Sequence, residues 1–142
     1  MSEPNRQAID TIRGYLYQFD HTIFQILNHH DENSIFTIEG VEDIDIELLH
    51  DETVTIQCKY YEKTDFTPAV IKEATIWMIK DFYQRIQQQK ELIQYKLFGH
   101  FKSGGNKIPK TISVEYLKKN LLTKTTRATE KSPSVEVRVY EQ

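Results

Sequence analysis

The sequence predicts one α/β domain in which helices flank a mixed sheet. Apolar residues recur at helical spacing over residues 9–26 and again over 71–86, and alternating strands lie between these two segments. A further apolar and aromatic segment follows the second helix. The chain has 142 residues without an internal repeat or a linker, which is the length of a single domain. We expect its core over about residues 5–101, with 102–142 peripheral.

The first helix is expected from near Pro4 to residues 28–31. Its apolar residues lie three or four positions apart and form one stripe: Ile9, Ile12, Leu16, Phe19, Ile23 and Ile26. Proline suits the start of a helix because its missing N–H group would have no helical partner there.

Three strands are expected next, at residues 34–39, 43–49 and 53–61. In the second strand, acidic residues at 43, 45 and 47 alternate with apolar ones. In the third, Gln57 and Lys59 share one face, opposite apolar residues. The short turn at 50–52 predicts that these two strands pair as a hairpin.

The second helix is expected over residues 68–89, with Pro68 in its first turn. A fourth strand at 93–101, a polar loop at 102–109 and a short helix at 113–122 follow. Residues 123–133 are polar, and 134–140 alternate as a last strand. In this order a helix can cover one face of a mixed sheet.

Composition excludes several classes of protein. With 39% hydrophobic and 27% charged residues, and only 5 Gly and 4 Pro, the chain is neither collagen-like nor low-complexity. It has no apolar run of membrane-spanning length and no signal peptide, so we expect no membrane partner. The single cysteine, Cys58, excludes an internal disulfide and fits a reducing cytosol, so the predicted location is cytoplasmic.

Charge is segregated along the chain although the net charge is only -3. Residues 31–65 contain eleven acidic residues and two lysines, whereas 101–127 contain seven basic residues and one glutamate. An acidic centre beside basic segments fits a metal site that meets a polyanion. Ordinary solvated surface explains the same pattern.

Polar side chains of three strands are expected to converge. Asp43 and Asp45 lie on the second strand, Gln57 and Lys59 on the third, and Glu39 at the end of the first. Carboxylate and amide oxygens are ligands for Mg²⁺ or Mn²⁺, and such an ion can activate water against a phosphodiester. A lysine beside it can orient the nucleophile or offset charge on the phosphoryl group.

Three motifs carry a family resemblance. Residues 14–18 read Gly-Tyr-Leu-Tyr-Gln, residues 39–46 read Glu-Gly-Val-Glu-Asp-Ile-Asp-Ile, and residues 57–61 read Gln-Cys-Lys-Tyr-Tyr. In this order they resemble the PD-(D/E)XK superfamily. More narrowly, they resemble the double-stranded-DNA endonuclease domain of bacterial anti-phage systems such as CBASS and Lamassu. The resemblance covers residues 13 to about 100.

The resemblance implies roles for individual residues. Asp43 takes the metal-binding acid position, Gln57 the second ligand position and Lys59 that of the catalytic lysine. Glu39 matches a further acidic position, and Gln18 a helix residue that faces the site. Asp45 is an alternative to Asp43, since both are expected on the same face.

The resemblance also implies a restriction-endonuclease-like α-β-β-β-α-β core and an Mg²⁺- or Mn²⁺-dependent endonuclease acting on double-stranded DNA in bacterial anti-phage defence. The alternative is a catalytically inactive module of the same fold that docks protein or nucleic acid. Tyr61, Lys102 and Lys107 are weaker candidates for DNA contact. Family members usually carry a sensor or oligomerisation region and act as oligomers. The chain is too short for that region, so we expect it either to be a fragment of a longer protein or to act with a separate partner.

Overall fold

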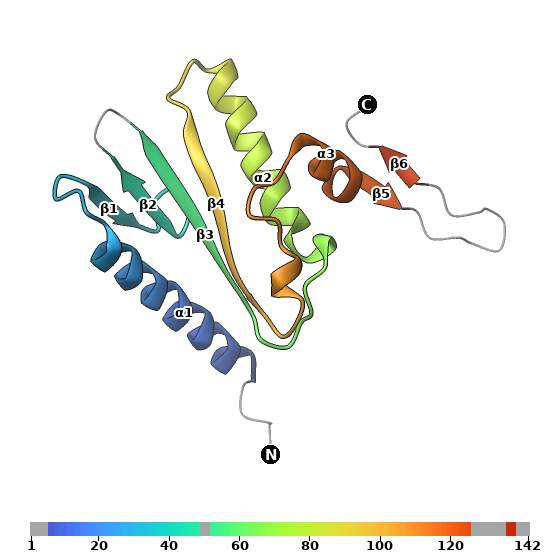
Figure 1. The fold of residues 1–142 in the computed structure, drawn as a ribbon, viewed down its shortest axis with the longest axis horizontal. Coiled ribbons are helices and arrows are strands. Elements are labelled where there is room, and N and C mark those ends of the chain that lie inside the picture. Colours follow the sequence, from blue (N-terminus) through green and yellow to red (C-terminus); the bar gives the residue numbers. More distant parts are fainter. Residues whose placement is uncertain (1–5, 49–51, 126–135, 139–142) are drawn as a thin grey trace.

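The computed structural model describes residues 6–48, 52–125 and 136–138, and Figure 1 shows their arrangement. Four strands form one sheet in chain order: β1 (Ile35–Ile38), β2 (Ile44–Glu47), β3 (Thr53–Tyr61) and β4 (Ile93–Phe101). The pairs β1–β2 and β2–β3 are antiparallel, and β3–β4 is parallel. The predicted α/β class with a mixed sheet is therefore confirmed.

The helix α1 (Arg6–Asn28) covers one face of this sheet, and its end at residue 28 agrees with the prediction. Tyr17 stacks on Phe98 of β4 with ring centroids 5.4 Å apart, and His21 stacks on the same ring at 3.5 Å. Gln18 is buried on this side of the helix. The apolar stripe seen in the sequence lies on the other side and is exposed, so α1 meets the sheet through polar and aromatic side chains.

The first three strands form an antiparallel meander. Its buried core cluster consists of Ile44, Ile46, Val54 and Ile56. The register places Asp45 of β2 opposite Thr55 of β3. β3 and β4 have the predicted bounds, whereas β1 is one residue shorter than predicted at each end, and β2 begins one residue later than predicted and ends at Glu47.

The helix α2 (Pro68–Gln87) connects the two parallel strands. It begins after the N-cap Thr67, with proline in its first turn, where no helical hydrogen bond is lost. The Tyr95 hydroxyl of β4 donates to Asp81 of α2, so this helix covers the sheet face opposite α1. A second core cluster lies at the start of α2: Phe66, Ile71, Phe101 and Leu121.

Short elements follow β4. The expected polar loop contains a 3₁₀ turn, η1 (Gly105–Lys107), and the expected short helix consists of α3 (Val114–Tyr116) and the π-helical turn η2 (Leu117–Leu121). β5 (Thr123–Thr125) lies in the polar segment 123–133, where no strand was predicted, and pairs with β6 (Glu136–Arg138), inside the predicted last strand.

Some predictions lie outside the described residues: the helix start near Pro4, most of the turn at 50–52, and parts of 123–140. Among the described helices, none combines the length and the apolar character needed to cross a membrane.

Candidate functional site

The candidate site lies where β2 begins and β3 passes beside it. Because Ile44 is opposite Ile56, the same antiparallel register brings Asp43 next to Gln57. The Asp43 carboxylate accepts a hydrogen bond from the Cys58 backbone N–H at 2.5 Å. The aspartate is therefore fixed to β3 by the side chain itself.

Helix α1 contacts the start of β2 from the opposite face of the sheet. The buried Gln18 amide donates to the backbone carbonyl of Asp43, with the two atoms 3.3 Å apart. The family resemblance implies that Gln18 faces the site; its amide contacts the backbone of Asp43 from the α1 side of the sheet. α1 thereby helps to hold the start of β2 in place.

The Gln57 amide has an oxygen that the protein does not satisfy. Among the buried side-chain nitrogen and oxygen atoms of the described residues, Gln57 Oε1 is the one without a hydrogen-bond partner. Leaving a buried carbonyl unsatisfied costs about 1–3 kcal/mol, so such an atom calls for an explanation. A bound cation, or a ligand that donates a hydrogen bond, would give this oxygen a partner.

Two charged groups complete the cluster. Burial raises the pKa of Glu42 to about 7, and the nearby Asp43 carboxylate adds to the rise, while Lys59 and Gln57 oppose it. Lys59 is half-buried on the same strand face as Gln57. Carboxylates, an amide and an ammonium therefore share one small area, as expected from the sequence.

Glu42 was missed by the sequence reasoning. It stands beside Asp43 in the acidic motif at 39–46, which was the available signal. Strand alternation could not predict on which side of the sheet Glu42 lies, because the turn extends to residue 43 and β2 begins only at 44. In that turn, Glu42 reaches the cluster that Asp43 and Gln57 form.

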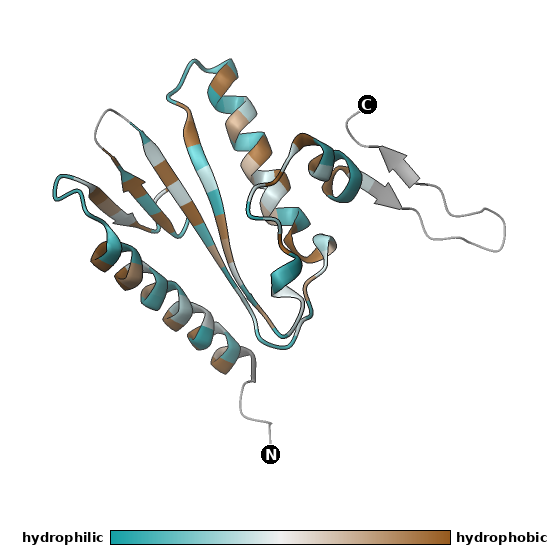
Figure 2. Ribbon diagram, in the orientation of Figure 1, coloured by the Kyte–Doolittle hydropathy of each residue, from teal (hydrophilic) through white to brown (hydrophobic). Residues whose placement is uncertain are grey.

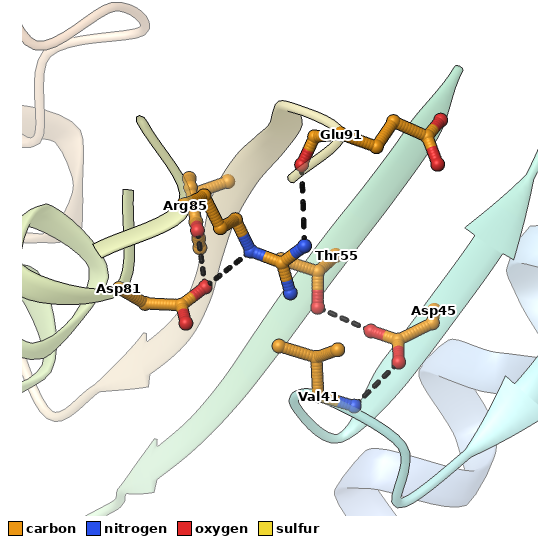
Figure 3. A network of polar contacts seen from close by, with 7 residues as sticks. Val41, Asp45, Thr55, Asp81, Arg85 and Glu91 are labelled. Atoms are coloured by element: carbon orange, nitrogen blue, oxygen red, sulfur yellow. Dashed lines mark hydrogen bonds and ion pairs between the residues drawn. The ribbon is translucent and has the colours of Figure 1, made fainter. Parts of the chain in front are cut away.

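Asp45 has a different environment from Asp43. It is buried, and its carboxylate accepts hydrogen bonds from the Thr55 hydroxyl and, at 2.5 Å, from the Val41 backbone N–H (Figure 3). A Cβ added to Gly40 would clash with Asp45 Oδ2, so the turn is built closely around this carboxylate. Both oxygens of Asp45 have protein donors, which makes Asp43 the better metal-ligand candidate.

The remaining predicted residues lie around the cluster. Glu39 is exposed in the turn, with φ 56°, and its backbone N–H donates to the Asp43 carbonyl at 3.0 Å. Tyr61 stacks on Phe101 at 5.5 Å and packs against the second core cluster. Lys102 and Lys107 are exposed beyond the end of β4.

The donor set fits a hard divalent cation. The Asp43 and Glu42 carboxylates and the Gln57 carbonyl are oxygen ligands of the kind that Mg²⁺ and Mn²⁺ take, usually together with water. The described residues contain no group of three His, Cys, Asp or Glu arranged for a metal, so the amide and water would have to complete the coordination.

A second polar network lies on the same sheet face, between α2 and the strands. Asp81 accepts hydrogen bonds from Tyr95 and, at 2.8 Å, from Arg85 Nε. Figure 3 shows Arg85 between Asp81 and the backbone carbonyl of Glu91, to which it also donates at 3.3 Å. Here each charged group has protein partners.

Comparison of the chain with known protein families, with curated proteins and with solved structures finds no significant match.

Proposed function

We propose that the chain is a metal-dependent endonuclease domain that hydrolyses phosphodiester bonds of double-stranded DNA. The observation that carries the proposal is the unsatisfied Gln57 oxygen beside Asp43, Glu42 and Lys59. The element order α1-β1-β2-β3-α2-β4 with a parallel last pair agrees with the restriction-endonuclease-like core that the sequence motifs imply. Both the duplex substrate and the anti-phage setting rest on that resemblance.

Each residue of the cluster has a role in this proposal. Asp43, Gln57 and Glu42 would hold Mg²⁺ or Mn²⁺, which when bound polarises the phosphate and lowers the pKa of a water molecule. Gln57 contributes a neutral oxygen, so the site gains a ligand without further negative charge to repel the phosphate. Asp43 is held by the Cys58 N–H, which orients its carboxylate.

Lys59 supplies the positive charge. Its ammonium acts on the Glu42 carboxylate, which places it within electrostatic range of the proposed ligands. A fixed ammonium stabilises the negative charge that grows on the phosphoryl oxygens in the transition state. It also orients a water molecule by hydrogen bonding, and no covalent enzyme intermediate is required.

Exposed lysines after β4 would meet the DNA backbone. Lys102, Lys107 and Lys110 lie on the exposed surface of the segment that follows Phe101, whose strand partner is Tyr61. Phosphate contacts of this kind carry no sequence information and weaken steeply with salt. The proposed nuclease therefore has little sequence discrimination.

The test is nicking and linearisation of a supercoiled plasmid with Mg²⁺ or Mn²⁺. We expect metal-dependent cleavage by the purified chain, lost in Lys59→Ala and Asp43→Asn and retained in the matched controls Lys96→Ala and Glu47→Gln, which alter exposed residues of the same sheet. Cleavage that survives both site substitutions overturns the assignment. Binding of DNA without cleavage, measured alongside the assembly state, supports the inactive docking module instead.

A further inference from the structure

The exposed side of α1 carries a regular apolar pattern. Successive apolar positions are separated by three, four, three, four and three residues: Ile9, Ile12, Leu16, Phe19, Ile23 and Ile26. This is the a/d spacing of a heptad repeat, the pattern by which helices pair in coiled coils. All six side chains are about half exposed, from 46% for Phe19 to 58% for Ile12.

The rest of the helix is already used by the protein's own fold. Gln18, His21 and Thr22 are buried against the sheet. Gln18 and His21 occupy heptad positions c and f, away from the a/d seam, and Thr22 lies at position g on the side of the seam nearer the sheet. The seam therefore points away from the sheet, and Figure 2 shows its apolar residues recurring in brown along α1. An apolar stripe of this length on a surface marks an interaction site.

We propose that two copies of the chain associate through antiparallel pairing of their α1 helices. The stripe is complementary to itself in that orientation. Centred between Tyr17 and Gln18, a two-fold axis matches Leu16 with Phe19 of the second copy and repeats the match outward along the helix: Ile12 with Ile23 and Ile9 with Ile26. Every a position then meets a d position.

The charges beside the seam favour the same orientation. Arg13 and Asp20 occupy successive e positions, and e residues face e residues across an antiparallel pair. Arg13 of one copy therefore lies near Asp20 of the other, twice in each dimer. In a parallel pair the e residues face g positions, where Tyr15 and Thr22 offer no opposite charge. Within one chain Arg13 pairs with the exposed Glu62, and that contact lies at the edge of the seam.

A second copy fits this surface better than a membrane does. Arg13 and Asp20 flank the seam with one charge of each sign and so give no excess of positive charge, whereas helices that lie in a membrane interface are rich in lysine and arginine. The a/d pattern covers residues 9–26 of the 23-residue helix, so three layers of facing side chains on each side of the two-fold axis would form the interface.

Sedimentation velocity over a concentration series tests the pairing. We expect reversible dimers of the full chain, and Leu16→Glu should raise the dimer dissociation constant by at least about 30-fold. Val114→Glu is the matched control, because Val114 is 65% exposed outside α1 and should leave the dimer unchanged. Circular dichroism checks that each variant folds. A chain that stays monomeric at all concentrations overturns the proposal, and binding of that monomer to anionic lipid vesicles would assign the stripe to a membrane.

Orientation is tested by charge exchange and cross-linking. Arg13→Asp and Asp20→Arg should each weaken the dimer about three- to tenfold, and the double variant should restore it. Glu62→Gln controls for the ion pair within one chain and should have no effect. A mixture of Ile12→Cys and Ile23→Cys should form disulfides between the two variants. Disulfides formed within each variant alone would indicate a parallel pair and contradict the proposal. Neither test depends on nuclease activity.

Discussion

Two carboxylate-centred groups lie on the sheet face toward α2, and they differ in how completely the protein satisfies them. Asp81 receives hydrogen bonds from Arg85 and Tyr95, and the arginine also reaches a backbone carbonyl. Around Asp43, the Gln57 oxygen lacks a partner and Glu42 lies among like charges. The protein itself therefore supplies hydrogen-bond partners for the polar groups around Asp81, but it leaves the Gln57 oxygen near Asp43 without one.

The pKa values move in opposite directions for this reason. Burial by itself would raise the pKa of Asp81, but the hydrogen bonds from Tyr95 and Arg85 outweigh it, and the pKa is lowered. Burial and the neighbouring Asp43 raise the pKa of Glu42 to about 7. A fold gains stability from the first arrangement and loses some through the second, which is typical of sites that a ligand completes.

The largest expected effect is on activity. Lys59→Ala should lower the rate of plasmid cleavage by about 10²- to 10³-fold, because it removes the ammonium that offsets phosphoryl charge. Thermal unfolding should change little, since Lys59 is half-buried and belongs to neither hydrophobic core cluster. Gel-based cleavage rates measure the first effect and calorimetry the second. A large loss of stability in this variant would place Lys59 with the structural network instead.

The next effect is on stability. Asp45→Ala should lower the free energy of unfolding by about 3 kcal/mol, because the Thr55 hydroxyl and the Val41 N–H lose their acceptor in a buried place. Urea unfolding measures this loss of unfolding free energy. Gly40→Ala should be destabilising for the related reason that its Cβ meets the same carboxylate. A neutral Asp45→Ala variant would contradict the structural role given to this aspartate.

Asp81→Asn should have a smaller effect that depends on pH. We expect a loss of about 1–2 kcal/mol at neutral pH, where the carboxylate accepts two hydrogen bonds. Because the pKa of Asp81 is lowered on folding, its contribution is present above the unfolded pKa near 4 and is lost as the pH falls through the folded pKa. Urea midpoints measured from pH 7 down to pH 3 should therefore converge for variant and wild type. Parallel pH profiles would refute this origin of the stability.

The smallest stability effect is expected at Gln57. Gln57→Leu removes a buried unsatisfied amide oxygen, but it also removes the amide hydrogen bond to Glu42, so the unfolding free energy should stay within about 1 kcal/mol of wild type. Cleavage should nevertheless be abolished. Arg85→Leu is the contrasting variant, since it breaks the satisfied network and should destabilise the fold while leaving the cleavage chemistry intact.

Local sequence patterns predicted most of the fold. Alternation along β3 and the apolar and aromatic content of β4 gave their bounds, and Pro68 marked the start of α2. The side of α1 that faces the sheet could not be predicted in this way, because its apolar stripe points outward and packing uses Gln18, His21 and aromatic rings. β5 was missed because three polar residues carry no strand pattern of their own.

The site was predicted in part for similar reasons. Alternation and the hairpin placed Gln57, Lys59 and Asp43 together, since all three follow from strand register. The strand pattern could not show which of Asp43 and Asp45 is the better metal-ligand candidate. That distinction depends on the Thr55 hydroxyl and the Val41 N–H, which donate to Asp45. Glu42 lies in the same turn as Val41, outside the strand, so the alternation of side chains along a strand gave no prediction for it.

Titration of the folded chain with Mn²⁺, followed by electron paramagnetic resonance, tests the proposed cation site most directly. We expect wild-type protein to bind Mn²⁺ at this cluster, Asp43→Asn to lose that binding and Gln57→Leu to weaken it. Glu47→Gln, on an exposed residue at the end of β2, should bind as wild type does. Absence of binding in the wild type, or binding that is the same in all four proteins, would contradict the assignment of a metal to Asp43 and Gln57.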